Sequence, residues 1–186
     1  MKRIIAFLLS VLCFLPVLSS CGEDRPVVEI KVRDFGTITV ELRRDIAPIT
    51  VDNFLSLVDS GFYDGLTFHR IMQNFMIQGG DPKGNGTGGS EKTIKGEFSA
   101  NGVKNTLTHV RGTISMARSS AYNSASSQFF ICNADSTFLD GQYAAFGYVT
   151  DGMDVVDAIT QYAVRLGYTE TVPKADQPVI ESIRRK

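Results

Sequence analysis

The sequence predicts a mainly β fold, a closed eight-stranded antiparallel barrel capped by two helices. Short apolar runs alternate with polar residues and are separated by turn signals rich in Gly, Asp and Asn, which is typical of half-buried strands. Only two segments show the apolar period of an amphipathic helix. The 186 residues suffice for one domain with its own core.

Two alternating segments open the predicted domain. Residues 27–33 place Val28, Ile30 and Val32 on one side, and residues 36–42 repeat the pattern. An Asp-Phe-Gly turn signal separates the two segments. Together they predict a hairpin with one buried face.

A helix is predicted after Pro48, because proline suits the first turn of a helix. Gly61 fits the position that ends it. The helix would cover the open end of the barrel. Its apolar stripe consists of Val51, Phe54, Leu55 and Val58.

Two short apolar strands around Phe68 and Met76 follow, joined by a tight turn at Gln73 and Asn74. A long irregular region, residues 79–107, comes next, and glycine occupies six of its first eleven positions. The region is too long for a mere connection, which favours a functional role.

The rest of the chain predicts four more strands and a second helix over residues 153–162, where Met153, Val156, Ile159 and Ala163 recur at helical spacing. A polar loop is expected over residues 118–126, and Phe138-Leu139-Asp140-Gly141 ends in a turn signal. The strands are expected over residues 112–117, 128–132, 144–149 and 179–183.

Residues 1–20 are interpreted as a signal peptide, since a positive start precedes an apolar run of about fifteen residues, which is short for a membrane span of roughly 20. Leu18-Ser19-Ser20-Cys21 resembles the bacterial lipobox, which implies cleavage before Cys21 and lipid on its sulfur. Residues 21–26 would then form a short spacer, and residues 27–186 an exported domain anchored to a bacterial membrane, on its periplasmic or cell-surface side. The alternative is a plain secretory signal with a chance cysteine.

Composition excludes several classes of function. The net charge of -1 makes nucleic acid a poor partner. Two histidines and no Cys-x-x-Cys pair make a zinc site very unfavourable, and no other metal or cofactor is indicated. After loss of Cys13 and lipidation of Cys21, Cys132 would stand alone, so no internal disulfide is expected.

Alternation also places side chains in a groove. Met76 and Gln78 share one strand face, and Gln128 and Phe130 share another, so each strand presents an apolar group beside an amide. The partners of these residues in the alternation, Ile77, Phe129 and Ile131, would fill the barrel core. Arg70 is expected to share its face with Phe68, and His69 to alternate away from it as a structural residue. Such a groove suits an extended peptide carrying a proline ring.

Five blocks of the sequence resemble the signature blocks of cyclophilin-type peptidyl-prolyl cis-trans isomerases, in the family's order and at compatible spacing. The resemblance covers the chain from about Val27 to its end and implies the family's barrel and its activity on X–Pro bonds. The blocks are Phe68-His69-Arg70-Ile71, Phe75-Met76-Ile77-Gln78-Gly79-Gly80-Asp81, Gly86-Thr87-Gly88-Gly89, Ser127-Gln128-Phe129-Phe130-Ile131 and Phe138-Leu139-Asp140-Gly141.

The resemblance implies catalytic roles for Arg70, Phe75 and Gln78, with Arg70 donating to the proline nitrogen. It implies proline-containing polypeptides, exported or unfolded, as clients, and no cofactor; a monomer is the default expectation. The implied substrate-binding residues are Met76, Gly86, Ala117, Arg118, Ser119, Gln128, Phe130, Phe138, Leu139 and Tyr143.

The sequence departs from the family's pattern at three places. Phe138 stands where many eukaryotic members carry a tryptophan that donates its indole N–H to cyclosporin, so weaker cyclosporin binding is expected. Tyr143 replaces a frequent groove histidine. The usual Ala-Asn-Ala is Ala117-Arg118-Ser119 here. These departures resemble those of bacterial members.

Alternative functions remain open on the residues alone. A chaperone could hold proline-containing peptide in the same groove with incidental or no catalysis, and a barrel with an eroded site is a further possibility with little support. Gly84-Asn85-Gly86-Thr87-Gly88-Gly89 matches a dinucleotide fingerprint, but no amphipathic helix follows it. Cys132 lies in an apolar run and is interpreted as a buried structural thiol rather than a nucleophile.

Overall fold

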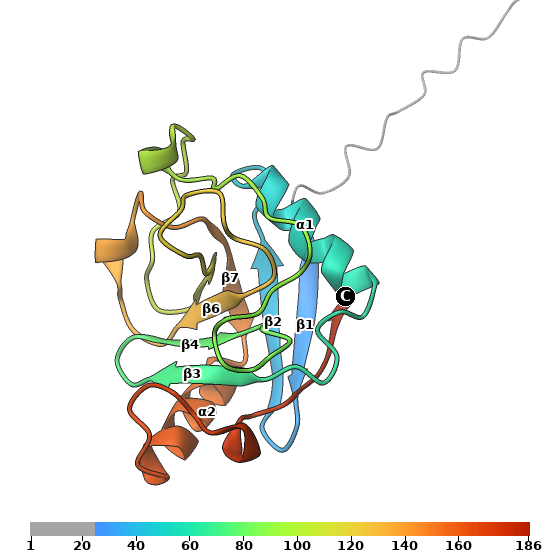
Figure 1. The fold of residues 1–186 in the computed structure, drawn as a ribbon, viewed down its shortest axis with the longest axis vertical. Helices are drawn as coiled ribbons and strands as arrows, with labels where there is room; N and C mark the ends of the chain where they lie inside the picture. Colours follow the sequence, from blue (N-terminus) through green and yellow to red (C-terminus); the bar gives the residue numbers. More distant parts are fainter. Residues whose placement is uncertain (1–24) are drawn as a thin grey trace, which may run out of the picture.

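The computed structural model describes residues 25–186. The predicted signal peptide and Cys21 therefore lie outside the described residues. Eight strands form one antiparallel sheet in the order β3-β4-β6-β5-β7-β2-β1-β8 (Figure 1). The strands are β1 (Val27–Val32), β2 (Gly36–Leu42), β3 (Phe68–Met72), β4 (Met76–Gly79), β5 (Thr113–Met116), β6 (Phe129–Cys132), β7 (Ala145–Asp151) and β8 (Ile180–Arg185).

The sheet curls strongly, but its two edges meet only briefly. Strands β3 and β8 are connected through the isolated bridge between Thr67 and Val179. Two backbone hydrogen bonds flank it, from Phe68 N to the Pro178 oxygen at 2.9 Å and from Ile180 N to the Leu66 oxygen at 2.8 Å. A closed barrel was therefore a slight overstatement. One more backbone hydrogen bond, from Gly65 N to the Ile180 oxygen at 2.8 Å, belongs to the same short contact.

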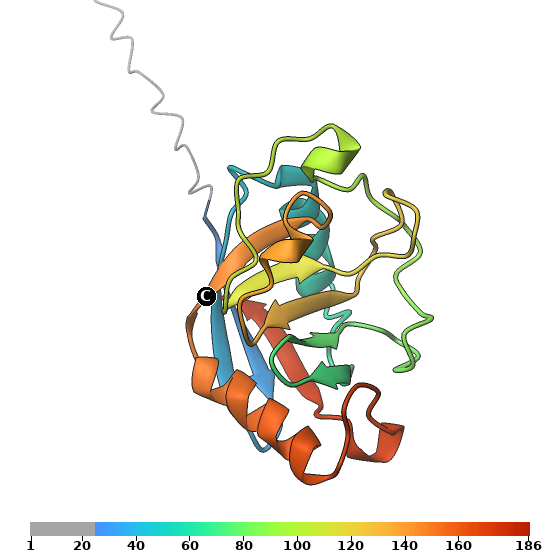
Figure 2. The same ribbon diagram turned by 90° about the vertical axis from the view of Figure 1, so that its left-hand side faces the viewer.

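Two helices lie at opposite ends of the curled sheet, as Figures 1 and 2 show. Helix α1 (Pro48–Asp59) packs beside β8, and helix α2 (Met153–Arg165) packs beside β2, β3 and β4. Three short 3-10 helices complete the fold: η1 (Ser99–Asn101), η2 (Thr137–Leu139) and η3 (Lys174–Asp176). Within residues 25–186, neither α-helix is both long and apolar enough to cross a bilayer.

The predicted ends of the helices follow from local chemistry. Pro48 occupies the first turn of α1, and Gly61 follows its end with φ +70°, a conformation that suits glycine. Helix α2 runs one turn beyond the predicted residue 162 and stops before Gly167, whose φ is +83°.

Two apolar clusters lie on the two faces of the sheet. The large inner cluster contains Phe54, Tyr63 and Phe129, whose rings meet at 5.2–5.6 Å between centroids. A small outer cluster consists of Met76, Phe130, Cys132 and Leu139. Alternation along β4 and β6 thus separates core from groove, as the sequence predicted.

Candidate active site

The β3–β4 hairpin carries Arg70 to the outer face of the sheet. A β-bulge between Phe68 and Arg70 interrupts the alternation. Phe68 is consequently fully buried in the core, whereas Arg70 pairs with Gln78. The prediction that Arg70 and Phe68 share a face was wrong, because a bulge adds one residue to one strand and reverses the side-chain pattern.

The guanidinium of Arg70 has contacts on three sides. Its Nε donates to Glu170 Oε1 at 2.8 Å, and its Nη1 lies 3.4 Å from Gln78 Oε1. Its Nη2 lies 3.2 Å from the sulfur of Met72, and its Cζ is 6.0 Å from the ring centre of Phe75. Arg70 is therefore a partly exposed cation held at the edge of an apolar surface.

Arg70 lines a cavity of about 280 Å³ on the outer face. The lining combines this cation, an amide and several rings, and the wall opposite β3–β4 comes from the segments after β5 and around η2. The lining residues are His69, Arg70, Phe75, Gln78, Gly86, Ala117, Arg118, Phe130, Leu139 and Tyr143. All of these lining residues except His69 were predicted site residues.

The floor of this cavity is apolar and firmly packed. Phe130 and Leu139 are buried, and Met76 lies with them in the outer cluster without lining the cavity. Tyr143 meets Phe130 edge-on, with ring centroids 6.0 Å apart. The predicted Phe138 lines neither this cavity nor its neighbour. It is 70% exposed, and its ring stands at the rim, 5.6 Å from that of Phe75.

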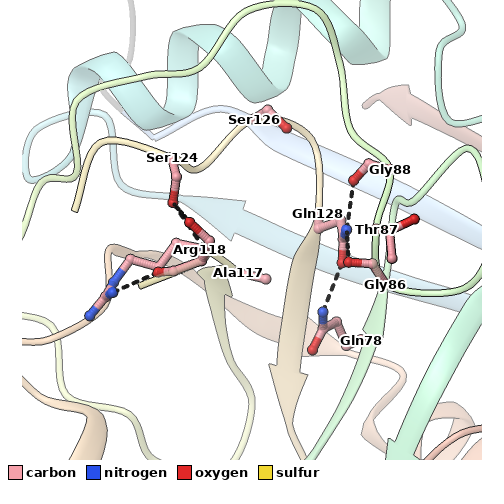
Figure 3. Close-up of a pocket in the computed structure, with 10 residues that line it drawn as sticks. Gln78, Gly86, Thr87, Gly88, Ala117, Arg118, Ser124, Ser126 and Gln128 are labelled. Carbon is pink, nitrogen blue, oxygen red and sulfur yellow. Dashed lines mark hydrogen bonds between the residues drawn. The ribbon is translucent and has the colours of Figure 1, made fainter. Parts of the chain in front are cut away.

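A second cavity of about 260 Å³ adjoins the first and shares Gln78, Gly86, Ala117 and Arg118 with it. Figure 3 shows its two walls, one formed by Gln128 and the Gly86–Gly88 loop, the other by Ala117 and Ser124. The predicted Ser119 and Gln128 lie in this second cavity rather than in the first. Thr87, Gly88, Ser124 and Ser126, which the sequence prediction did not assign to the site, complete it.

A chain of amides connects the two cavities. Gln78 Nε2 donates to Gln128 Oε1 at 2.8 Å, and Gln128 Nε2 donates to the Gly88 oxygen at 2.7 Å (Figure 3). Asp81 fixes the other side of the loop by accepting backbone N–H groups of Lys83 and Gly86 at 2.8 and 2.6 Å. Burial alone would raise the pKa of Asp81, but the N–H groups that it accepts hold that pKa below its usual range.

Arg118 closes the junction between the two cavities. Its Nε and Nη2 donate to the Gln142 oxygen at 3.0 and 2.9 Å, and Nη1 donates to the Ser119 oxygen at 2.9 Å. Its Cζ lies 4.6 Å from the ring centre of Tyr143 and 5.2 Å from that of Phe98. The guanidinium thus ties the 118–126 loop to the wall that carries Tyr143.

Two buried side chains near the groove keep their neutral forms. Neither ring nitrogen of His69 has a hydrogen-bond partner among residues 25–186, and burial lowers its pKa, although the charge of Asp81 opposes the shift. Burial raises the pKa of the Cys132 thiol to about 12. Cys132 is therefore a buried, inert thiol of the outer cluster, and its burial was predicted.

The sequence prediction missed one contact of Arg70 altogether. Glu170 follows it by 100 residues and carries no motif that would draw attention. Only the fold brings the segment after α2 beside β3. No group of three or more His, Cys, Asp or Glu side chains within residues 25–186 is placed to hold a metal ion.

Comparison with known proteins identifies close relatives of the chain. A family model described as "Cyclophilin type peptidyl-prolyl cis-trans isomerase/CLD" matches residues 27–185. A peptidyl-prolyl cis-trans isomerase of Acinetobacter baylyi is 45% identical over 173 residues, which cover 88% of this chain and 86% of the relative. Peptidyl-prolyl cis-trans isomerase A of Dickeya dadantii is 39% identical over 189 residues, with 96% and 94% coverage.

A solved structure shares the fold. The crystal structure of a cyclophilin-type peptidyl-prolyl cis-trans isomerase from Cryptosporidium parvum, determined in the presence of the dipeptide Ala-Pro, matches with a TM-score of 0.75 and 30% identity. The match covers 86% of this chain and 98% of the other.

Proposed function

The chain belongs to the cyclophilin-type peptidyl-prolyl cis-trans isomerases, and on this premise we propose that Arg70, Phe75 and Gln78 accelerate X–Pro rotation in exported polypeptides. The established part is the family's reaction, the cis-trans isomerisation of X–Pro bonds. The residue roles, the clients and the cellular location are the proposal.

The reaction needs a geometry more than a reagent. Rotation about an X–Pro bond crosses a barrier of about 18–20 kcal/mol, because the C–N bond is partly double. No bond to carbon forms or breaks, so neither a nucleophile nor a metal is required. A catalyst must instead favour the twisted amide, whose nitrogen has become pyramidal and basic.

One observation carries the assignment: a cation and an apolar floor line the same cavity of about 280 Å³. In the proposed complex Arg70 Nη1, on the cavity side of the guanidinium, donates to the prolyl nitrogen of the twisted amide. Phe130 and Leu139, with Phe75 at the side, enclose the proline ring. Exclusion of water from such a pocket strengthens the hydrogen bond.

The second cavity would receive the neighbouring part of an extended peptide. A strand-like peptide advances about 3.3 Å per residue, so a chain with its proline in the first cavity reaches the second within a few residues. Gln78 and the main chain near Arg118 would hold its backbone. The relative from Cryptosporidium parvum, solved in the presence of Ala-Pro, supports proline-containing peptides as ligands of this fold.

Substitution of Arg70 tests these roles. With the purified full chain, Arg70→Ala is expected to lower kcat/KM for a short X–Pro peptide by a factor of roughly 10²–10³, as for loss of a preorganised donor. Circular dichroism and thermal unfolding establish that the variant is folded. An unchanged kcat/KM in a folded variant would refute the role of Arg70.

The chaperone alternative predicts a different result. If peptide holding is the main function, Arg70→Ala should lose isomerase activity but still suppress aggregation of an unfolded client as well as the wild type does. Loss of both activities in Arg70→Ala, and likewise in Phe130→Ala, which removes the pocket floor, would favour a single groove that serves catalysis.

The location of the protein is a separate proposal, and it concerns residues outside the described part of the chain. The lipobox-like Leu18-Ser19-Ser20-Cys21 supports export and lipid attachment at Cys21. Cys21→Ala should then move the protein from the membrane fraction to the soluble fraction. Mass spectrometry of the wild-type N-terminus should find lipid on Cys21, and its absence would leave a plain secretory signal. Sedimentation equilibrium of the purified protein tests the separate expectation of a monomer.

A further inference from the structure

The guanidinium of Arg70 shares an ion pair with Glu170, a residue of the segment between α2 and η3. Both Nε and Nη2 lie 2.8 Å from the same oxygen, Glu170 Oε1. The carboxylate therefore covers one whole edge of the guanidinium. Glu170 does not line the cavity in which Arg70 lies.

The backbone holds Glu170 in place independently of its side chain. Ile71 N donates to the Glu170 oxygen at 2.8 Å, and Val172 N donates to the His69 oxygen at 3.0 Å. Thr171 forms an antiparallel bridge with Arg70. The segment around Thr171 thus forms an isolated bridge along the outer edge of β3, and its backbone holds Glu170 beside Arg70.

The contacts of Arg70 leave one group for the substrate. Nε and Nη2 face Glu170, and Nη2 also lies 3.2 Å from Met72 Sδ. The contact that the described residues give Nη1 is the long one of 3.4 Å to Gln78 Oε1. Nη1 is therefore the group turned toward Gln78 and the cavity.

Stability does not explain this ion pair. The side chains of Arg70 and Glu170 are 34% and 53% exposed, and pairs of such exposure contribute little to folding free energy. An unrestrained arginine, by contrast, has many rotamers, and a donor weakens steeply when its angle to the acceptor is poor. The gain from the pair lies in orientation.

We propose that Glu170 is a positioning residue for the isomerase reaction, which holds the guanidinium of Arg70 so that Nη1 faces the prolyl amide. This inference rests on the proposed role of Arg70. The carboxylate also reduces the positive potential of the guanidinium, which opposes catalysis. Orientation outweighs this effect, because twisting the amide creates no full charge, whereas the hydrogen bond requires a well-aligned donor.

Substitutions of Glu170 in the full chain test the proposal. Glu170→Ala is expected to lower kcat/KM for an uncharged X–Pro peptide by about 3- to 30-fold, mostly in kcat, because the donor acts in the transition state. Glu170→Gln, which keeps the shape and one acceptor, should fall between wild type and Glu170→Ala. Glu181→Ala serves as the control, because Glu181 on β8 forms a comparable ion pair with Lys31 on β1 at 2.8 Å. The kcat/KM of this control variant should match that of wild type.

Two further measurements separate positioning from a general structural effect. In the Arg70→Ala background, Glu170→Ala should cause no further loss, because the carboxylate acts only through the guanidinium. In NMR spectra, the Arg70 Nε–H, assigned through its loss in Arg70→Lys, should exchange with solvent faster in Glu170→Ala than in wild type.

The outcomes are distinguishable. An equal or higher kcat/KM in folded Glu170→Ala and Glu170→Gln, with Arg70→Ala still impaired, would overturn the positioning role and leave the function of Arg70 intact. Full activity of Arg70→Ala would instead overturn the proposed function itself. An additive loss in the double variant would show that Glu170 acts elsewhere and would also overturn the inference.

Discussion

The imidazole of His109 lies almost parallel to the ring of Phe130, with centroids 6.0 Å apart and planes 17° from each other. Its Nδ1 is 2.8 Å from Asp140 Oδ1, and its Nε2 is 2.9 Å from the hydroxyl of Ser115. Asp140 directly follows η2, which carries Leu139. One buried histidine therefore ties the floor of the cavity that Arg70 lines to its wall.

Replacing His109 with phenylalanine should weaken both the fold and the site. The new ring keeps the contact with Phe130, but it leaves the buried hydroxyl of Ser115 without a partner. The free energy of unfolding should fall by about 1–3 kcal/mol. We expect kcat/KM to fall by up to about tenfold, because small displacements of groups that position substrate are costly.

A second substitution checks this explanation. Ser115→Ala in the His109→Phe background removes the orphaned hydroxyl, so the double variant should be more stable than His109→Phe alone in urea unfolding. Ser115→Ala in the wild-type background should destabilise, because it removes a partner from His109. Additive losses in this cycle would contradict the assigned hydrogen bond.

Stability should also depend on pH through the two histidines. Burial lowers the pKa of both His69 and His109, against the opposing charges of Asp81 and Asp140; the charge of Arg70 adds to the shift at His69. In the unfolded chain each titrates near its ordinary value of about 6.5. Below that pH the unfolded state binds protons that the folded state does not bind, so acid favours unfolding.

The two histidines are therefore expected to leave the free energy of unfolding undiminished above about pH 6.5. This free energy should fall as the pH drops from there toward the lowered pKa values of the folded state. The slope is at most about 1.4 kcal/mol per pH unit for each histidine. Urea unfolding between pH 5 and 7.5 measures the slope. His109→Phe should reduce it by the share of one histidine. A slope equal to that of wild type would mean that His109 titrates alike in both states.

Much of the fold could be predicted because alternation was regular. Ile77 and Phe129 lie in the core and Phe130 lies in the groove, as their positions in the strands predicted. Pro48 and Gly61 marked the limits of the first helix through backbone chemistry alone. The five sequence blocks brought together most of the cavity lining, because each block is a strand or a turn with a fixed geometry.

The rest depended on contacts between distant segments. The bulge before Arg70 arises in the pairing of β3 with β4, and no local signal marks it. Glu170 reaches Arg70 only because the segment after α2 pairs with the edge of β3. His69 was expected to be structural, and it is buried, but the bulge also brings it to the lining of the cavity.

Glu97 should be a strong determinant of stability, because it caps α1 from a distant loop. Ala47, at the helix N-cap, offers no side-chain acceptor. Glu97 is only 2% exposed, and it accepts hydrogen bonds from the backbone N–H groups of Ile49 and Thr50 at 3.1 and 2.7 Å. These N–H groups belong to the first turn of α1, where backbone N–H groups have no hydrogen-bond partner within the helix.

Glu97→Ala is expected to lower the free energy of unfolding by about 2–3 kcal/mol, since it leaves these donors and the Thr50 hydroxyl without their charged acceptor. Urea unfolding at pH 7 measures the change. Glu91→Ala is the control, because Glu91 lies on the same loop and is exposed. Equal stabilities of the two variants would show that solvent replaces the carboxylate at no cost.

Phe138 should limit the affinity for cyclosporin without limiting catalysis. Its ring stands at the rim of the cavity, 70% exposed, and packs 5.6 Å from Phe75. The resemblance to the family implies a tryptophan at this position in many eukaryotic members, with an indole N–H that donates to cyclosporin. Phenylalanine keeps the apolar wall that a proline ring needs, but it has no donor.

Phe138→Trp is accordingly expected to bind cyclosporin about 5- to 10-fold more tightly, the gain of roughly one hydrogen bond of 1–1.4 kcal/mol. Calorimetric titration measures the affinity, and kcat/KM for an X–Pro peptide should stay within about twofold, because both side chains are apolar at the rim. Phe138→Leu separates the two effects, since it removes the ring without adding a donor and should not tighten cyclosporin binding. Equal tightening by Leu and Trp would mean that shape at the rim, rather than the indole N–H, controls the affinity.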